Sequence, residues 1–167
     1  FDLEMSVGAA CRLEYAVNGK GELQVRMDYR PLKDGLQLIP KVGMRMRIPA
    51  EYSQVSWYGR GPHENYPDRK SGYFIGQYSM PLDEFIFDYA SPQDNANRCD
   101  TRWFSLGNSS RDIEIHGLQE LNFRAWPYGE EDLEGSAHPF DIPARDFINV
   151  NIDFKIHGVG GNDGWGA

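Results

Sequence analysis

The residues whose types and spacing most clearly indicate a binding site lie near the end of the chain, in the stretch GVGGNDGWG at positions 158–166. Trp165 stands between two glycines, outside any periodic apolar run that would bury it in a sheet. An exposed indole on a polar loop is a usual platform for the C–H face of a sugar, a contact that contributes about 0.5–1.5 kcal/mol beyond area burial. Asn162 and Asp163 join Trp165 in this candidate substrate-binding site. The alternative is an indole that folds back on its own domain or a neighbouring one.

A second candidate set lies in the polar loop GRGPHENYPDRK over residues 59–70, where His63 precedes Glu64 and Asp68 follows. A histidine base beside a carboxylate would suit a sugar epimerase. A retaining glycosidase needs two carboxyl groups roughly 5–5.5 Å apart, and nothing in the local sequence fixes that separation. We therefore interpret Glu64 and Asp68 as loop-structuring acceptors, keep His63 and Glu64 as weaker substrate-binding candidates, and assign no catalytic residue.

The charge balance restricts the class of partner. The chain carries 17 basic and 25 acidic residues, a formal net charge of −8. This balance argues against a nucleic acid or an anionic membrane as partner, and it fits a neutral ligand. No run of about 18 apolar residues is present, so no membrane span is expected.

Cysteines and histidines give no metal-site pattern. The four histidines and two cysteines show no ligand spacing, so we expect no metal or cofactor in this part of the protein. Whether Cys11 and Cys99 pair stays open, but Cys99 is expected to be a buried, inert thiol. We expect His116 and His157 on the solvated polar faces of strands, and Arg98 and Arg102 in structural ion pairs.

The elements that must position these residues are predicted from alternation of apolar and polar residues with period two. Asn18 and Gly19 are expected to supply the positive φ angles of a hairpin turn. Only residues 129–138 have helix-compatible composition, and the loops 59–70 and 80–97 are long enough to be functional. The fold class is therefore all-β, an antiparallel β-sandwich with little helix, in one domain over residues 1–167. The predicted strands lie within residues 11–31, 41–49, 54–59, 72–80, 101–107, 111–118, 120–126 and 146–160.

Three segments together resemble a known family. They are WYGRGPHENYPDRKSG at 57–72, FDYASPQDNANRCDTRW at 87–103 and NIDFKIHGVGGNDGWG at 151–166. Their order and spacing are similar to those of the β-galactosidase small chain, the C-terminal domain of bacterial β-galactosidases of glycoside hydrolase family 2. The resemblance covers nearly the whole chain. It departs from the family pattern at Asn162 and Gly164, where the family more often has Asp and Ser, and this puts the preference for the leaving-group sugar in doubt.

The resemblance implies a supersandwich similar to galactose mutarotase, here a fragment of the family domain. It implies a parent enzyme that cleaves terminal β-galactosides such as lactose with retention. In that enzyme the catalytic glutamates and the Mg²⁺ and Na⁺ ligands belong to other domains, chiefly a TIM barrel. Trp165 matches the family's tryptophan in the subsite for the leaving-group sugar, which favours the exposed indole over the packed one.

The expected partners are the other TIM-barrel and sandwich domains of the same enzyme, a β-galactoside substrate and further copies in a homo-oligomer. Two alternatives stay open: a non-catalytic carbohydrate-binding or docking module, and a mutarotase-like epimerase. Compartment is not predicted, because the sequence offers no signal from which to argue it.

Overall fold

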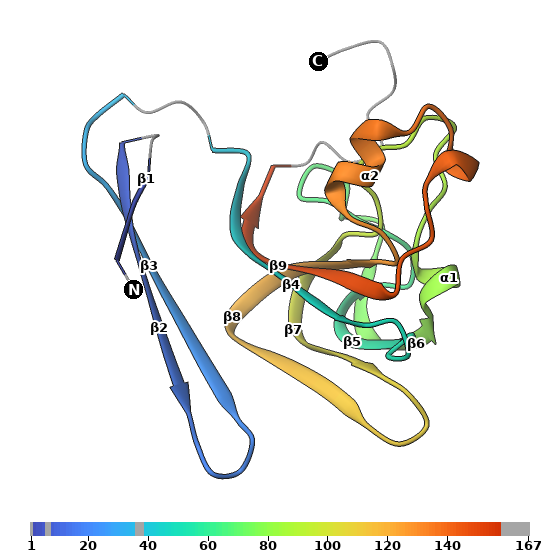
Figure 1. Ribbon diagram of the computed structural model, residues 1–167, viewed down its shortest axis with the longest axis horizontal. Helices are drawn as coiled ribbons and strands as arrows, with labels where there is room; N and C mark the ends of the chain where they lie inside the picture. The colour runs from blue at the N-terminus through green and yellow to red at the C-terminus, as the bar shows by residue number, and fades with distance from the viewer. Residues whose placement is uncertain (1, 6–7, 36–38, 158–167) are drawn as a thin grey trace. The chain divides into compact units, whose positions relative to one another are not determined.

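The computed structural model describes residues 2–5, 8–35 and 39–157 (Figure 1). The chain divides into an N-terminal unit, Phe1–Ile39, and a C-terminal unit, Pro40–Ala167. Both units are built on antiparallel sheets, and the described helices are short. The predicted all-β, antiparallel fold class with little helix is therefore confirmed. No helix among the described residues has the length and apolar character needed to cross a bilayer.

The N-terminal unit is a three-stranded sheet with the order β1-β2-β3. Antiparallel pairing of β2 with β3 confirms the hairpin that alternation predicts. In β3, Val25, Met27 and Tyr29 are half-buried, while the residues between them are exposed. The sheet therefore has one partly covered apolar face. Its strands are β1 (Asp2–Met5), β2 (Ala9–Val17) and β3 (Leu23–Pro31).

The turn of this hairpin differs from its prediction. The positive φ angle belongs to Gly21, at 84°, and neither Asn18 nor Gly19 has one. Asn18 instead closes the turn through its side chain, whose Oδ1 accepts hydrogen bonds from the backbone N–H groups of Lys20 (2.9 Å) and Glu22 (3.1 Å). An asparagine side chain that mimics a backbone turn removes the need for a left-handed conformation at its own position.

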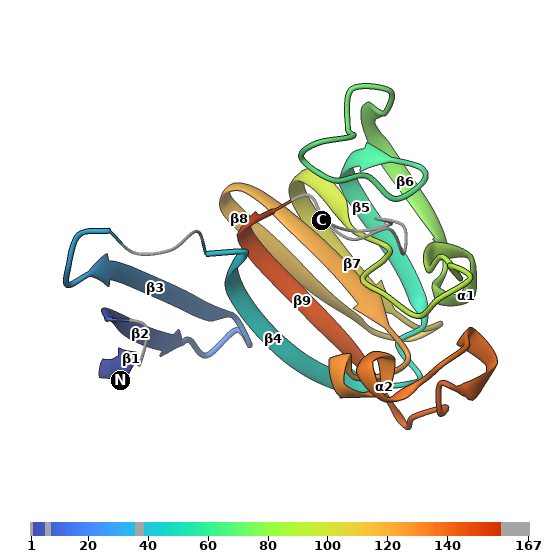
Figure 2. The ribbon, with the colours of Figure 1, turned by 90° about the horizontal axis from the view of Figure 1, so that it is seen from above.

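The C-terminal unit holds a six-stranded sheet with the order β4-β9-β8-β7-β5-β6, seen face-on in Figure 2. Two short helices and a 3₁₀ turn accompany it: α1 (Leu82–Phe85), α2 (Glu130–Gly135) and Pro139–Asp141. The helix α2 lies within the segment of helix-compatible composition, whereas α1 is not predicted. The strands are β4 (Lys41–Pro49), β5 (Gln54–Gly61), β6 (Phe74–Pro81), β7 (Arg98–Gly107), β8 (Asp112–Trp126) and β9 (Phe147–Ile156).

The two strands predicted over 111–118 and 120–126 form one strand, β8. The junction contains Gly117 but no Pro, Asn or Asp, and the strand continues through it. Residues between Asp112 and Phe123 pair with β7, with shifts in register, and residues Asn122–Trp126 pair with β9. One continuous strand thus joins the two halves of the sheet.

Aromatic side chains form the centre of the core. Phe104 and Phe123 stack with ring centroids 4.1 Å apart, and Trp57 meets the edge of Phe85 at 5.4 Å. All four are buried. Trp57 is a fully buried core residue. These rings fix β5, β7, β8 and α1 against one another.

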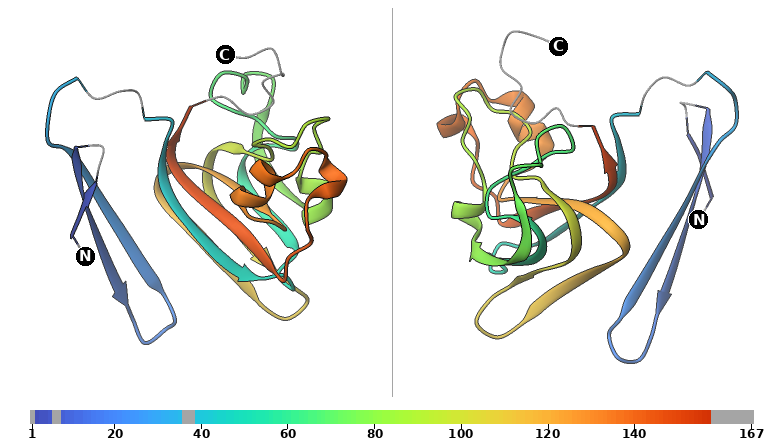
Figure 3. Two further views of the ribbon diagram at one scale, coloured as in Figure 1. Left: turned by 45° about the horizontal axis from the view of Figure 1, so that its top comes forward. Right: turned by 180° about the vertical axis from the view of Figure 1, so that it is seen from behind.

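The strand β9 is buried on both sides, which corrects the expectation of a solvated polar face. Ile148 and Val150 belong to the core, but Asn149, Asn151 and Asp153 are also at most 1% exposed. The helix α2 lies over this side of the sheet (Figure 3). The polar row of β9 is therefore an interior feature, whereas the predicted exposure of His116 and His157 is confirmed.

Candidate functional site

Trp165, Asp163 and Asn162 lie outside the described residues, so their role as a substrate-binding group stays a prediction. What the structure describes is the point from which this segment departs. The strand β9 ends at Ile156, and the backbone N–H of His157 donates to the carbonyl of Pro40 at 2.7 Å. The chain is thus fixed to the six-stranded sheet immediately before the glycine-rich segment.

Glu64 is held between the two long loops. Its carboxylate accepts hydrogen bonds from the Ala96 backbone N–H at 2.7 Å, from Arg69 Nη2 at 3.4 Å and from the Tyr89 hydroxyl. These contacts bear out the interpretation of Glu64 as a loop-structuring acceptor. The neighbouring His63 is exposed, and its imidazole forms no hydrogen bond or ion pair with the described residues. A substrate contact by His63 or Glu64 stays a prediction.

The loops 59–70 and 80–97 are joined by further hydrogen bonds. The Asn65 backbone N–H donates to the Asn97 carbonyl at 2.8 Å, and Asn97 Nδ2 returns a bond of 2.8 Å to the Asn65 carbonyl. The Tyr66 hydroxyl donates to Asp94 Oδ1 at 2.5 Å. Burial, together with the Asp94 charge, raises the pKa of Tyr66, so the phenol stays a donor. The two loops therefore form one hydrogen-bonded assembly.

Arg98 is enclosed by this assembly. Its guanidinium donates to the carbonyls of Pro62 (3.0 Å), Ala96 (3.0 Å) and Phe85 (3.2 Å), and it stacks 4.0 Å from the centre of the Phe85 ring. Burial lowers its pKa to about 9. The expected ion pair is absent from the described contacts, because carbonyl groups satisfy the guanidinium instead. The ion pair expected for Arg102 is present, with Glu120 at 2.5 Å.

Both cysteine thiols are free and buried. Burial raises the pKa of Cys99 to about 12. A thiol this hard to ionise is a poor nucleophile, which confirms the prediction of an inert group. Among the described residues, no group of three or more His, Cys, Asp and Glu side chains is arranged to hold a metal ion.

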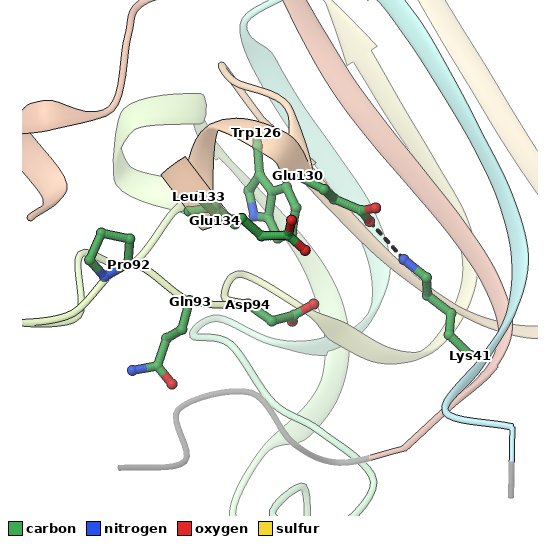
Figure 4. A pocket seen from close by; sticks show the side chains of 8 residues that line it. All are labelled: Lys41, Pro92, Gln93, Asp94, Trp126, Glu130, Leu133 and Glu134. Carbon is green, nitrogen blue, oxygen red and sulfur yellow. Dashed lines mark hydrogen bonds and ion pairs between the residues drawn. The ribbon is translucent and has the colours of Figure 1, made fainter. Parts of the chain in front are cut away.

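A pocket of about 300 Å³ opens between α2, the end of the 80–97 loop and the sheet (Figure 4). The carboxylates of Asp94, Glu130 and Glu134 and the ammonium group of Lys41 point toward the same space. The pocket therefore combines acceptors, a donor and apolar side chains within reach of one small molecule. Its lining consists of Lys41, Pro92, Gln93, Asp94, Trp126, Glu130, Leu133 and Glu134.

Ion pairs hold the walls of this pocket. Lys41 Nζ lies 2.7 Å from Glu130 Oε1. The buried Arg124 contacts two of the wall carboxylates: its Nη1 lies 2.9 Å from Asp94 Oδ2, and its Nη2 lies 3.8 Å from Glu130 Oε1. The Arg124–Asp94 contact has ion-pair distance without hydrogen-bond alignment, because Nη1 makes no hydrogen bond to the described residues. Burial opposes ionisation of Glu130, but Lys41 and the nearby arginines outweigh it and lower its pKa.

The polar row of β9 lies in register with Arg124. Asn151 is the β9 partner of Arg124, and Asp153 Oδ2 lies 3.6 Å from Arg124 Nη2. Both oxygens of Asp153 and both polar atoms of the Asn149 amide lack hydrogen-bond partners among the described residues. Burial raises the pKa of Asp153 to about 6, while Arg124 and Lys41 act in the opposite direction. The sheet below α2 thus holds buried donor and acceptor atoms that form no hydrogen bond with the described residues.

One signal for this site is present in the sequence, although alternation alone misses it. Asn and Asp are depleted in strands, yet Asn149, Asn151 and Asp153 occupy one side of a nine-position alternating run, with Arg124 in a neighbouring strand. Three such residues in phase favour a buried polar row over a solvated face. The pocket walls, by contrast, come from distant segments that no spacing rule connects.

Comparison with known proteins identifies relatives along the whole chain. Residues 1–167 match the family described as the β-galactosidase small chain. A β-galactosidase of Priestia megaterium is 35% identical over 160 residues, which cover 95% of this chain and 15% of the relative. A β-galactosidase of Halalkalibacterium halodurans is 33% identical over 93% of this chain and 16% of the relative. A β-galactosidase of Vibrio cholerae is 32% identical over 97% of this chain and 15% of the relative. The chain spans about 15% of the length of these relatives.

Proposed function

Because the chain belongs to the β-galactosidase small chain family, we propose that it forms part of a retaining β-galactosidase and completes the subsite for the leaving-group sugar. The catalytic glutamates and the Mg²⁺ and Na⁺ ligands lie in other domains in this proposal. The observation that carries it is the family match over residues 1–167, combined with relatives that are named β-galactosidase and are more than six times longer.

Within this proposal, Trp165 stacks on the leaving-group sugar, and Asn162 and Asp163 contact its hydroxyl groups. The attachment of His157 to Pro40 supports such a role, because it fixes the base of the segment that carries all three. The hydrogen bonds that Glu64 accepts from Ala96, Arg69 and Tyr89 support a structural role for this carboxylate. The proposed partners are the remaining domains of the enzyme and, in a homo-oligomer, further copies of it.

The test is a comparison of Trp165→Ala and Trp165→Phe in the full-length enzyme. For Trp165→Ala we expect kcat/KM for lactose to fall about tenfold and the inhibition constant of glucose to rise about tenfold, since a stacking contact of this kind is worth about 1.4 kcal/mol. Inhibition by galactose, which occupies the other side of the cleaved bond, is expected to stay unchanged. Trp165→Phe keeps an aromatic face and is expected to lie between the two.

If Trp165→Ala weakened inhibition by glucose and inhibition by galactose equally, the assignment of this residue to the leaving-group side would be contradicted. Turnover of β-galactosides by the 167-residue chain alone would contradict the placement of the catalytic glutamates elsewhere. The wild-type and Trp165→Ala enzymes are compared at equal folded fraction, measured by circular dichroism, so that a stability loss is not counted as a binding loss.

A further inference from the structure

We propose that the pocket between α2 and the six-stranded sheet binds a neutral polyhydroxyl ligand of monosaccharide size. The inference concerns the described lining residues of this pocket and does not rest on the proposed galactosidase function. Its volume of about 300 Å³ lies at the lower end of the range for small-molecule sites, which suits a single sugar ring.

The first argument comes from buried polar groups next to the pocket. Arg124 and the β9 residues Asn149, Asn151 and Asp153 are each at most 1% exposed, and each has at least one side-chain atom without a hydrogen-bond partner among the described residues. Native proteins rarely leave such groups unpaired, and the exceptions call for a bound molecule or a functional role. The unpaired atoms include donors, such as Arg124 Nε, and acceptors, such as both oxygens of Asp153, so a partner for them must offer both kinds of group.

The second argument is continuity between these groups and the pocket. Arg124 contacts Asp94 and Glu130, whose carboxylates form two of the pocket walls, and on its other side it lies 3.6 Å from Asp153. A ligand in the pocket that accepted a hydrogen bond from Lys41 and donated one to Asp94 or Glu130 would therefore contact the groups that Arg124 joins to the polar row. Figure 4 shows the wall carboxylates directed at this common space.

The third argument is charge. Three carboxylates, those of Asp94, Glu130 and Glu134, face one ammonium group, that of Lys41. Arg124 pairs with Asp94, and Lys41 with Glu130, so the carboxylate of Glu134 is the remaining charge of the lining and disfavours an anionic ligand. Sugar hydroxyls donate to carboxylates and accept from lysine and arginine, while Leu133 and Trp126 offer apolar contact for C–H groups. For a ligand of this size we expect a Kd of about 1 mM.

The site is tested by hydrogen–deuterium exchange of the intact protein with saturating galactose or glucose. We expect slower exchange in peptides covering 92–97 and 124–134, and no such local effect with glycine betaine at equal osmolality. The measurement reports where the ligand acts, so binding at a separate catalytic centre is not mistaken for this site. Unchanged exchange in these peptides, or the same slowing with betaine, would overturn the proposal.

Glu134→Ala is the diagnostic variant, because Glu134 is exposed, points into the pocket and makes no hydrogen bond or ion pair with the described residues. We expect it to weaken the protection by sugar about fivefold without lowering the thermal midpoint. Glu120→Ala, which removes an exposed carboxylate that pairs with Arg102, is the matched control and should leave the protection unchanged.

A crystal of the protein soaked in galactose supplies the second measurement. Sugar density touching Asp94, Glu130 or Arg124 supports the proposal, and ordered water alone at these groups identifies a hydration site and overturns it. Trp165→Ala is expected to keep the protection of residues 92–97. A fall in kcat/KM for lactose and a loss of sugar protection at residues 92–97 can therefore be distinguished.

Discussion

The carboxylate of Glu64 accepts a hydrogen bond from the backbone N–H of Ala96, 2.7 Å away, across 32 positions of sequence. Ala96 has a φ of 66°, which an alanine rarely adopts, and it is fully buried. The bond therefore fixes a strained backbone position at the end of one long loop to the middle of the other. With the Asn65–Asn97 and Tyr66–Asp94 hydrogen bonds, it connects the two long loops.

Glu64→Gln tests this connection. The amide keeps the shape but loses the charge that faces Arg69 and strengthens the bonds from Ala96 and Tyr89, so we expect a loss of about 1–3 kcal/mol in the free energy of unfolding. Urea denaturation measures it. Asp68→Asn is the control, since Asp68 is half-exposed and lies 3.8 Å from Arg69, and should change stability by less than about 0.5 kcal/mol. Equal effects of the two variants would contradict the assigned role.

Arg98→Lys is expected to be strongly destabilising. The guanidinium spans carbonyls of three separate segments, at Pro62, Phe85 and Ala96, and an ammonium group has neither the planar shape nor the reach to replace it. We expect a loss of at least about 3 kcal/mol in the free energy of unfolding. Arg102→Lys, at an exposed ion pair, should cost less than about 1 kcal/mol in the same denaturant titration. Similar losses at the two positions would show that Arg98 acts as an ordinary surface charge.

Asp153 is expected to make stability depend on pH. Its pKa rises from 3.8 in the unfolded chain to about 6 in the folded protein. Between these values the folded protein binds a proton that the unfolded chain does not. The contribution of Asp153 is therefore fully present below about pH 4 and is lost as the pH rises through about 6.

Asp153→Asn removes this titration. The free energy of unfolding of the variant relative to wild type is expected to increase by about 2–3 kcal/mol from pH 4 to pH 8. Urea titrations of both proteins at each pH measure the difference. Groups with lowered pKa, such as Asp100 and Asp132, are common to both proteins and cancel. A difference that stays constant with pH would mean that Asp153 keeps an ordinary pKa.

Cys99 should resist thiol reagents in the folded protein. Its pKa of about 12 leaves almost no thiolate at neutral pH, and its side chain is fully buried. In a Cys11→Ser background, which leaves Cys99 as the single thiol of this chain, we expect reaction with an aromatic disulfide reagent to occur only at the rate of unfolding. Urea should restore fast labelling. Rapid labelling without denaturant would contradict the assignment of a buried, inert thiol.

Period-two alternation predicts the sheet well because one covered face leaves a direct trace in sequence. It fails where the second face is also covered: the side chains of Asn149, Asn151 and Asp153 have the composition of a solvated face and the burial of a core. Whether α2 lies over them depends on contacts between segments far apart in sequence, such as Lys41 with Glu130, and no local pattern records those.

The hairpin turn shows the same limit of sequence patterns on a smaller scale. The sequence NGKG predicts a turn, but Asn18 can close it through its side chain or its backbone, and both are consistent with the same letters. For the candidate sites, the resemblance locates the segment of Trp165, whereas the pocket of Asp94 and Glu134 becomes visible only when the loops are folded.

Ion pairs at the surface connect α2 with β4. Lys41, Arg45 and Arg47 face Glu130 and Glu131 at distances from 2.5 to 3.8 Å, all of them a third or more exposed. Mobile ions shorten the reach of such pairs from about 8 Å at physiological ionic strength to about 3 Å in molar salt. High salt is therefore expected to weaken the attachment of α2 over the β9 polar row and to leave the apolar contacts of the aromatic centre unchanged.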